Sequence, residues 1–282
     1  MIGIIGGTGI YRMEGLELTE KIAVSTPFGD PSAPLLRGKL GEREIVFLPR
    51  HGSRHQFLPS EVNYQANIYA LKTVGVSKII GISAVGSLRR EIAPGDLSVP
   101  DQYFDWTRGQ RKGSFFGNGL VAHISTAKPV CPALVTAISR AGKSLALTVH
   151  TNKAYACVEG PRLGTQAESF FLRDSAGCDL VGMTNIPEAF LAREAQICYA
   201  TITIATDYDC WLDDPEQHVS VAKVLELYGK SLHKVNSLLK SLLSNPFPKI
   251  ECQCRTSLKE ALLTPEETLT DDQKELLTVL RK

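Results

Sequence analysis

The sequence lacks a strong charge of either sign: its 282 residues carry a formal net charge of +1 at pH 7. Proteins that bind nucleic acid or an anionic membrane surface have a basic excess. Long apolar runs are also missing, since none approaches the roughly 20 residues that a membrane span needs. The first residues include no basic segment ahead of an apolar one. We therefore expect a cytoplasmic protein with neither nucleic acid nor a membrane as partner.

A disulfide framework is not indicated either. The seven cysteines are odd in number and lie among apolar neighbours, a pattern typical of reduced thiols in a protein core. Cys252 and Cys254 form a close pair that would suit a metal or redox site, but no histidine or second pair lies near them in the sequence. We favour reduced thiols and expect no metal and no cofactor.

The sequence does contain an alternation of short apolar runs and longer amphipathic stretches. This pattern, without internal repeats or low-complexity tracts, predicts a single α/β domain around a central sheet. We expect strands at residues 2–6, 44–49, 78–83, 96–103, 154–159, 179–183 and 198–206. We expect helices at residues 61–74, 132–145, 165–176, 187–195, 219–243 and 271–281. Residues from about 245 should form a C-terminal tail, and residues 108–118 are typical of a mobile surface loop.

Two segments at predicted strand ends suit a phosphate group. Gly6-Gly7-Thr8-Gly9 can turn its backbone amides toward an anion, although a tight structural turn explains it equally well. A dinucleotide fingerprint would need a third glycine where Arg12 stands, so a nicotinamide oxidoreductase is disfavoured. Arg50, His51, Arg54 and His55 form a basic cluster that suits a doubly charged anion, or else a solvated loop.

Three further segments lie at strand ends, where an open α/β sheet has its ligand crevice. Small residues follow Ser83 and would let a ligand approach the backbone, although an ordinary strand-to-turn transition is the alternative. Glu159-Gly160-Pro161-Arg162 and Met183-Thr184-Asn185-Ile186-Pro187-Glu188 come next. Asp207 and Asp209 then follow a nearly pure apolar strand, where carboxylates need a reason to be present. A turn role for either aspartate is the simplest alternative.

Taken in order, these segments resemble the trimeric nucleoside phosphorylase family, and within it the methylthioadenosine phosphorylase branch. The resemblance spans roughly residues 2–225 and is carried by Thr26-Pro27-Phe28-Gly29, Arg50-His51-Gly52, Asn63-Tyr64-Gln65-Ala66-Asn67, Ser83-Ala84-Val85-Gly86-Ser87-Leu88, Pro94-Gly95-Asp96, Glu159-Gly160-Pro161-Arg162 and Ala205-Thr206-Asp207-Tyr208-Asp209-Cys210-Trp211. It implies a central mixed sheet flanked by helices, a homotrimer, and inorganic phosphate as a co-substrate that splits a purine nucleoside.

The resemblance also implies roles for individual residues. Met183 would lie beneath the ribose, and the phosphate would be held by Thr8, Arg50, His51, Ser83, the backbone of Ala84, and Thr184. We assign Asp207 as the general acid that protonates the leaving purine, because burial beside Asp209 should raise the pKa of one of the pair.

The base is expected to be adenine. A carboxylate accepts a hydrogen bond from a 6-amino group, whereas a 6-oxo group needs a donor. Relatives that cleave inosine and guanosine usually have Asn at the position of Asp207 and Glu at the position of Gly164. The methylthioadenosine branch usually has Ser at position 164 and an aromatic residue where Leu163 stands. These two departures keep a 6-oxopurine nucleoside or 5'-methylthioinosine phosphorylase open as an alternative.

An apolar wall would suit a methylthio group at the 5' position. Val221, Val224 and Leu225 are the residues predicted to supply it, although their spacing also fits the inward face of a packed helix. His123 aligns with a histidine that, in the family, reaches into the neighbouring subunit's site, and an ordinary surface histidine is the alternative. The sequence thus predicts phosphorolysis of 5'-methylthioadenosine to adenine and 5-methylthioribose 1-phosphate. A non-catalytic nucleoside-binding protein is the rival from another class.

Overall fold

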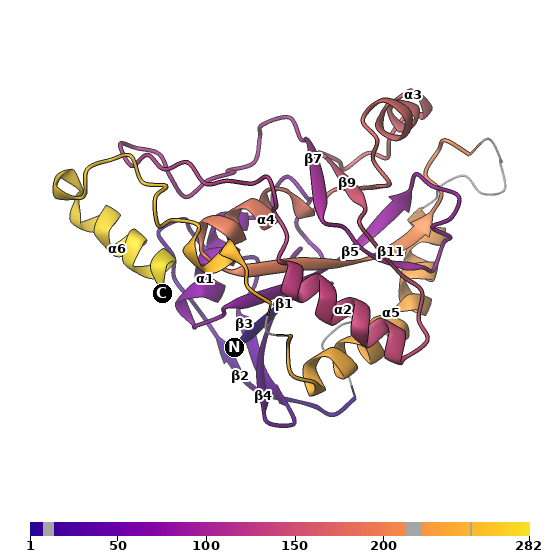
Figure 1. Cartoon of the computed structure of the whole chain (residues 1–282), viewed down its shortest axis with the longest axis horizontal. Coiled ribbons are helices and arrows are strands. Elements are labelled where there is room, and N and C mark those ends of the chain that lie inside the picture. The colour runs from indigo at the N-terminus through magenta and orange to yellow at the C-terminus, as the bar shows by residue number, and fades with distance from the viewer. Residues whose placement is uncertain (8–13, 213–220, 249) are drawn as a thin grey trace.

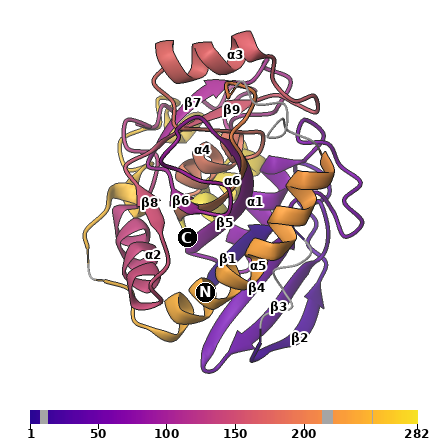
Figure 2. The ribbon, with the colours of Figure 1, turned by 90° about the vertical axis from the view of Figure 1, so that its right-hand side faces the viewer.

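A computed structural model describes residues 1–7, 14–212, 221–248 and 250–282, and the side chains of residues 221–224 lie outside the description. A mixed sheet runs through the middle of the molecule, with helices on both of its faces (Figures 1 and 2). No helix within these ranges is long and apolar enough to cross a membrane. The predicted α/β class and single sheet-centred domain are confirmed.

In the part of the chain that the structure describes, the sheet has eleven strands, with β1 and β5 at its centre. The order along one path is β2-β3-β4-β1-β5-β10-β9-β7, while β11 pairs with β5 and β6, and β6 pairs with β8. The strands are β1 (Ile2–Gly6), β2 (Leu16–Ile22), β3 (Leu35–Leu40), β4 (Arg43–Pro49), β5 (Lys78–Ser87), β6 (Leu97–Val99), β7 (Gln102–Trp106), β8 (Val149–Thr151), β9 (Ala154–Val158), β10 (Leu180–Gly182) and β11 (Cys198–Asp207).

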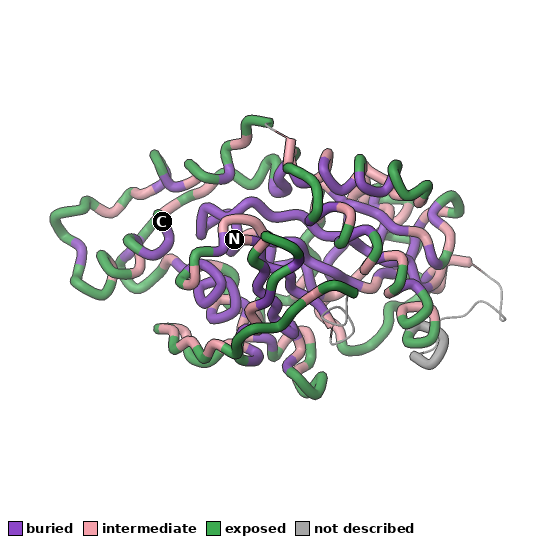
Figure 3. Tube along the Cα trace, turned by 90° about the horizontal axis from the view of Figure 1, so that it is seen from below, coloured by how far each residue is buried: buried purple, intermediate pink, exposed green. Residues whose placement is uncertain are grey.

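Two apolar clusters, one on each face, hold the helices to the sheet. One cluster joins Ile4 and Ile82 to α2 (Pro132–Ser144) and α5 (Val221–Ser244). The other joins Ile5 and Ile79 to α1 (Tyr64–Thr73), α4 (Asn185–Glu194) and α6 (Asp271–Arg281). The buried stretches of the chain run through the centre, where the strands lie (Figure 3). Neighbouring residues of a strand point to opposite faces of the sheet. A strand that is covered on both faces is therefore apolar along most of its length.

Several predicted elements differ from the structure. The strand predicted at residues 96–103 is two strands, β6 and β7, because Pro100 separates them and they pair with different neighbours. The strands β2, β3 and β8 were not predicted. The helix predicted at residues 165–176 is a short helix, α3 (Gln166–Phe170), followed by a π-helical turn (Phe171–Ser175). In the C-terminal tail, α6 packs on α1.

Candidate active site

A short gap in strand pairing interrupts one edge of β5, in the middle of the sheet. On one edge, β1 pairs with residues 78–81 of β5, and β10 pairs with Gly86 and Ser87. Residues 82–85 lie between these two partners. On the other edge, β11 pairs with β5 as far as Gly86. The gap therefore exposes the edge of Ser83 and Ala84 at a point where the strand order changes, which is where open α/β sheets bind ligands.

Two hydroxyl groups meet at this gap. The Oγ of Ser83 lies 3.0 Å from the Oγ1 of Thr184, although the two residues are 101 positions apart in the sequence. Both are buried, and Thr184 precedes α4, whose helical conformation is interrupted at Ile186, where φ is −113° and ψ is 129°. The structure thus brings together two of the residues predicted to bind phosphate, beside the backbone of Ala84.

Arg50 lies beneath the same gap, but most of its donors are already used. Its guanidinium makes two hydrogen bonds to the Glu188 carboxylate, of 2.7 and 2.8 Å, and NH1 donates to the Ile82 carbonyl at 2.8 Å. A longer bond of 3.4 Å joins NH2 to the Ile5 carbonyl. Only 2% of Arg50 is exposed. Of its five N–H groups, one remains for a phosphate oxygen.

His51 is held in one tautomer by a backbone carbonyl. Its Nδ1 lies 2.9 Å from the carbonyl oxygen of Phe57, and because a carbonyl only accepts, Nδ1 carries the hydrogen. Burial, with the charge of Arg50, lowers the pKa of His51 to about 4. The ring is therefore neutral at pH 7, with Nε2 free to accept a hydrogen bond. A nearby anion would favour the protonated ring.

The glycine-rich segment is described only as far as Gly7. The amide of Arg50 donates to the Gly6 carbonyl at 3.0 Å, which ties this segment to the end of β4. Thr8, the residue predicted to add a hydroxyl to the phosphate site, lies outside the described residues.

The two aspartates meet where β11 ends. The register of β11 against β5 shifts between Ala205 and Asp207, so a bulge at Thr206 sets Asp207 opposite Gly86. The Asp207 carboxylate accepts a 2.7 Å bond from the Thr206 hydroxyl and a 2.8 Å bond from the Asp209 amide. A Cβ on Gly86 would lie 3.1 Å from Asp207 Oδ1, so the glycine leaves room for this carboxylate.

Burial raises the pKa of both carboxyl groups. For Asp207, desolvation is the main cause and the charge of Asp209 adds to it, against the two hydrogen bonds just described. For Asp209, desolvation also dominates. Such a carboxyl group holds its proton at a higher pH than an ordinary aspartate does, which is the property a general acid needs.

A cavity of about 330 Å³ opens beside Asp209 and Gly164. It is lined by Glu159, Gly160, Arg162, Ser169, Val181 and Asp209, among others. Gly160 lies close to Met183: a Cβ on Gly160 would meet Met183 Sδ at 2.5 Å, and its φ of 71° favours glycine. The cavity is in the size range of small-molecule sites. A larger cavity, of about 830 Å³, lies at the other end of β1 and β5, away from these residues.

The prediction of a mobile loop at residues 108–118 is wrong at Arg111. Its side chain is only 2% exposed and forms a 2.8 Å ion pair with Glu159. It also donates to the carbonyl oxygens of Met183 and Ile186, at 2.7 and 2.6 Å. Arg111 therefore fixes the backbone on both sides of Thr184. A run of glycine and basic residues gave no local sign of these partners, which are at least 48 positions away.

The remaining predicted residues lie at the surface or outside the description. Leu163 is 44% exposed, Gly164 is exposed, and Leu225 is 65% exposed. The side chains of Val221 and Val224 are not described, so only their place at the start of α5 is known. His123 is exposed, and its amide donates to the Ala261 carbonyl at 2.8 Å. Among the described contacts, none joins His123 to the residues at the gap.

Glu188 lies in the segment 183–188, but sequence reasoning assigned it no role. Its carboxylate accepts three hydrogen bonds near the gap. It pairs with Arg50 and accepts a 2.8 Å bond from the Tyr199 hydroxyl. The only signal in the sequence was the position of this glutamate, in a segment predicted to begin a helix. Within the described residues, one group could hold a metal ion, formed by Cys131, Cys198, Cys252 and Cys254. It lies at the opposite end of β11 from Asp207.

Comparisons with known proteins identify the family of this chain. The sequence profile of the phosphorylase superfamily matches residues 1–244. An S-methyl-5'-thioadenosine phosphorylase of Geobacter sulfurreducens is 45% identical over 99% of this chain and 97% of its own. The structure of a methylthioadenosine phosphorylase from an antarctic soil metagenomic library is 40% identical, covers 99% of this chain and 98% of its own, and superposes with a TM-score of 0.91.

A variant of the adenosine/methylthioadenosine phosphorylase of Schistosoma mansoni, solved with methylthioadenosine, is 37% identical. It covers 86% of this chain and 90% of its own, with a TM-score of 0.81. Identity above 30% over nearly the whole chain, together with the same fold, establishes the relationship. The chain belongs to the phosphorylase superfamily, as an enzyme of its S-methyl-5'-thioadenosine phosphorylase group.

Proposed function

We propose that the enzyme uses inorganic phosphate to cleave 5'-methylthioadenosine into adenine and 5-methylthioribose 1-phosphate. The observation that supports this most directly is the arrangement along β5. The hydroxyl pair of Ser83 and Thr184 lies three strand residues from Gly86, opposite which Asp207 lies. Three residues of strand span about 10 Å. This separation leaves room for a ribose between a phosphate and a purine.

The residues at the phosphate end of the site supply hydrogen-bond donors but little net positive charge. Glu188 neutralises Arg50, so the anion would be held by the hydroxyls of Ser83 and Thr184 and by the last N–H of Arg50. Neutral His51 accepts a hydrogen bond or a proton from the phosphate through Nε2. Phosphate then attacks the anomeric carbon with its charge only partly compensated, which keeps it nucleophilic and lets it stabilise the cationic sugar.

The purine end supplies the proton. As the glycosidic bond breaks, its electrons move into the purine, and protonation at N7 makes adenine a better leaving group. Asp207 donates this proton, because desolvation raises its pKa and the Thr206 and Asp209 bonds fix its orientation. Asp209, on the wall of the cavity with Gly164, faces the base. The second oxygen of the Asp207 carboxyl group accepts a hydrogen bond from a 6-amino group, whereas a 6-oxo group would need a donor such as asparagine at this position.

Relatives with solved structures support the substrate. One is named an adenosine/methylthioadenosine phosphorylase and was solved with methylthioadenosine. The proposal for the present enzyme also places Met183 beneath the ribose. It includes an apolar wall at the 5' end, formed by Val221, Val224 and Leu225. The exposure of Leu225, at 65%, is consistent with a site that a substrate or a second subunit covers.

We also propose that the enzyme is a homotrimer in the cytoplasm. An exposed His123 has no described contact with its own subunit's site, as expected of a residue that acts in a neighbouring one. All seven cysteines are free, which suits a reducing compartment. Light scattering on the purified enzyme tests the trimer. A His123→Ala variant that stays trimeric but has a raised KM for the nucleoside would support the cross-subunit role, and an unchanged KM would contradict it.

The decisive experiment measures release of free base from methylthioadenosine, adenosine, methylthioinosine and inosine, each with and without phosphate. Strict dependence on phosphate, with methylthioadenosine turned over best, is the expected result. A preference for the 6-oxo substrates would keep the phosphorylase but refute the roles given to Asp207 and Asp209. Tight binding of nucleosides without turnover would instead select a binding protein.

A further inference from the structure

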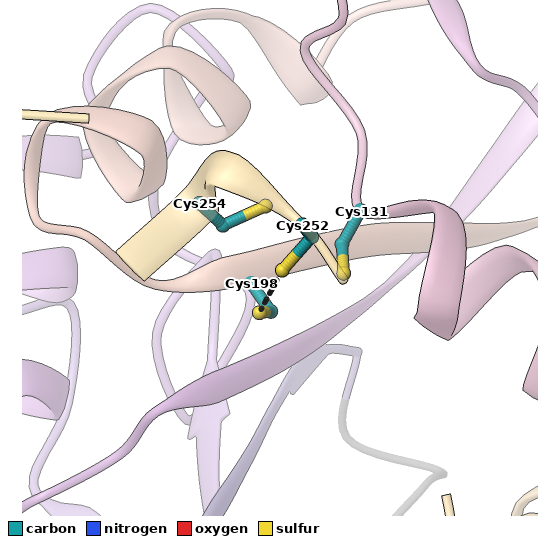
Figure 4. Close-up of side chains that lie close together, drawn as sticks. All are labelled: Cys131, Cys198, Cys252 and Cys254. Carbon is teal, nitrogen blue, oxygen red and sulfur yellow. Dashed lines mark hydrogen bonds between the residues drawn. The ribbon is translucent and has the colours of Figure 1, made fainter. Parts of the chain in front are cut away.

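Four cysteines from three distant parts of the chain meet in one place (Figure 4). Cys131 is the N-cap of α2, Cys198 begins β11, and Cys252 and Cys254 belong to the C-terminal tail around a 3-10 turn (Gln253–Thr256). Their four sulfur atoms all lie within 4.8 Å of one another. Three of the residues are buried and Cys252 is half-buried.

The spacing of the sulfur atoms suits a tetrahedral ion. A Zn–S bond of about 2.3 Å gives sulfur atoms about 3.8 Å apart at the corners of a tetrahedron. The Sγ atoms of Cys198 and Cys252 are 3.6 Å apart, and the other pairs stay within 4.8 Å. A disulfide, by contrast, brings two sulfur atoms to about 2.05 Å. The cluster is therefore arranged as four separate ligands.

A buried arginine beside the cluster has no carboxylate partner. Arg193 is 7% exposed, and its NH1 donates to Cys254 Sγ at 3.3 Å. Its Nε has no hydrogen-bond partner, and among the ion pairs of the described residues none includes Arg193. A buried charge without an opposite charge is strongly unfavourable. A neutral thiol is a weak acceptor and compensates little of it.

Cys131 also lies at the N-terminus of a helix, because it is the residue that precedes the first turn of α2. A thiolate is the form that binds a metal, and helix N-termini stabilise thiolates.

We propose that Cys131, Cys198, Cys252 and Cys254 bind one structural zinc ion. Binding releases the four thiol protons and leaves a complex with a net charge of −2, because four thiolates surround a divalent ion. That charge is the partner that Arg193 lacks. The ion joins the C-terminal tail to the start of β11 and to α2. The site is independent of the proposed substrate, because Asp207 lies at the far end of β11, roughly 30 Å away for a ten-residue strand.

The test is metal content and cobalt binding in the full-length enzyme. The wild type is purified under reducing conditions from zinc-supplemented cells, together with Cys252→Ser and, as a matched control, Cys178→Ser, a buried cysteine outside the cluster. We expect about one zinc per chain in the wild type and the control, and at least a tenfold lower content in Cys252→Ser. Co²⁺ added to the metal-free wild type should give thiolate-to-cobalt charge transfer and the intense visible bands of a tetrahedral site.

Thermal unfolding gives a second readout. Removal of zinc by a chelator should lower the Tm of the wild type and of Cys178→Ser, but leave the Tm of Cys252→Ser unchanged. A wild type that is fully reduced, free of zinc and unable to take up Co²⁺ would overturn the proposal. A metal-free enzyme in which mass spectrometry finds disulfides among these four cysteines would overturn it as well. Neither result would bear on phosphate-dependent cleavage, which is measured separately.

Discussion

Replacing Asp207 with asparagine tests the general acid most directly. Asparagine has the same shape, its Oδ1 can still accept the 2.8 Å bond from the Asp209 amide, and the fold around the bulge is retained. The variant loses only the acidic proton and the carboxylate. A positioned general acid contributes about 100- to 10,000-fold to a rate. We expect kcat for methylthioadenosine to fall at least 100-fold, equivalent to about 3 kcal/mol of transition-state stabilisation.

The same pKa shift predicts the direction of two pH effects. Because desolvation raises the pKa of Asp207, the folded protein binds this proton more tightly than the unfolded chain does. The stability that this proton confers is complete at acid pH and is lost as pH rises through the folded-state pKa. The turnover rate of the wild type should fall over the same pH range, because Asp207 can donate a proton only while it is protonated. Asp207→Asn should therefore be more stable than the wild type at alkaline pH while being far less active.

The assay follows adenine release at saturating phosphate, from acid to alkaline pH, for the wild type, Asp207→Asn and a control, Asp174→Asn. Asp174 is exposed and forms a surface ion pair with Arg173, so its loss should leave kcat unchanged. The wild type should lose activity as pH rises, and the residual activity of Asp207→Asn should not depend on that ionisation. An Asp207→Asn enzyme with nearly normal turnover and an unchanged pH profile would refute the assignment.

Three other substitutions test the buried charges. Glu188→Gln leaves the charge of Arg50 buried and uncompensated, so urea unfolding should show that the free energy of unfolding falls by about 3 to 5 kcal/mol. The control Glu20→Gln removes one partner of an exposed ion pair and should lower the free energy of unfolding by less than about 1 kcal/mol. Arg111→Met should raise the KM for the nucleoside and speed amide exchange at residues 108–118, whereas unchanged exchange would contradict its anchoring role. Burial raises the pKa of Glu194 to about 7, so Glu194→Gln should raise Tm relative to the wild type at pH 8 more than at pH 5.

The sequence predicted the elements whose burial is uniform. The runs at β1, β5 and β11 are largely apolar and buried because both faces of the sheet are covered, and their predicted starts agree with the structure. The strand β2 was missed because it is exposed along most of its length and reads as a charged segment. The strand β8 has only three residues, too few for any period to emerge.

Part of the candidate site could be predicted from the sequence, because polar residues that follow apolar runs mark strand ends. Thr184 and Asp207 each follow or end a strand, as predicted. Ser83 lies inside β5, because this strand continues to Ser87 and does not end at residue 83 as predicted. The structure places Ser83 and Thr184 in contact and Asp207 three strand positions beyond. The partners of Arg50 and Arg111 were not predictable, because a buried ion pair between residues 138 or 48 positions apart leaves no local pattern. The cysteine cluster was hidden for the same reason. Cys252 and Cys254 were visible as a pair, but their partners lie on α2 and β11.

The chemistry at Asp207 depends on backbone geometry as much as on the carboxyl group itself. In a regular strand, Asp207 would continue the alternation of β11, with its side chain in line with that of Ala205. The bulge at Thr206 interrupts that alternation, and Gly86 has no side chain to occupy the space that results. Among the described residues no cation pairs with this half-buried carboxyl group, and desolvation raises its pKa. A neighbouring arginine like the one that pairs with Glu188 would have produced a permanently ionised aspartate, unable to protonate a purine.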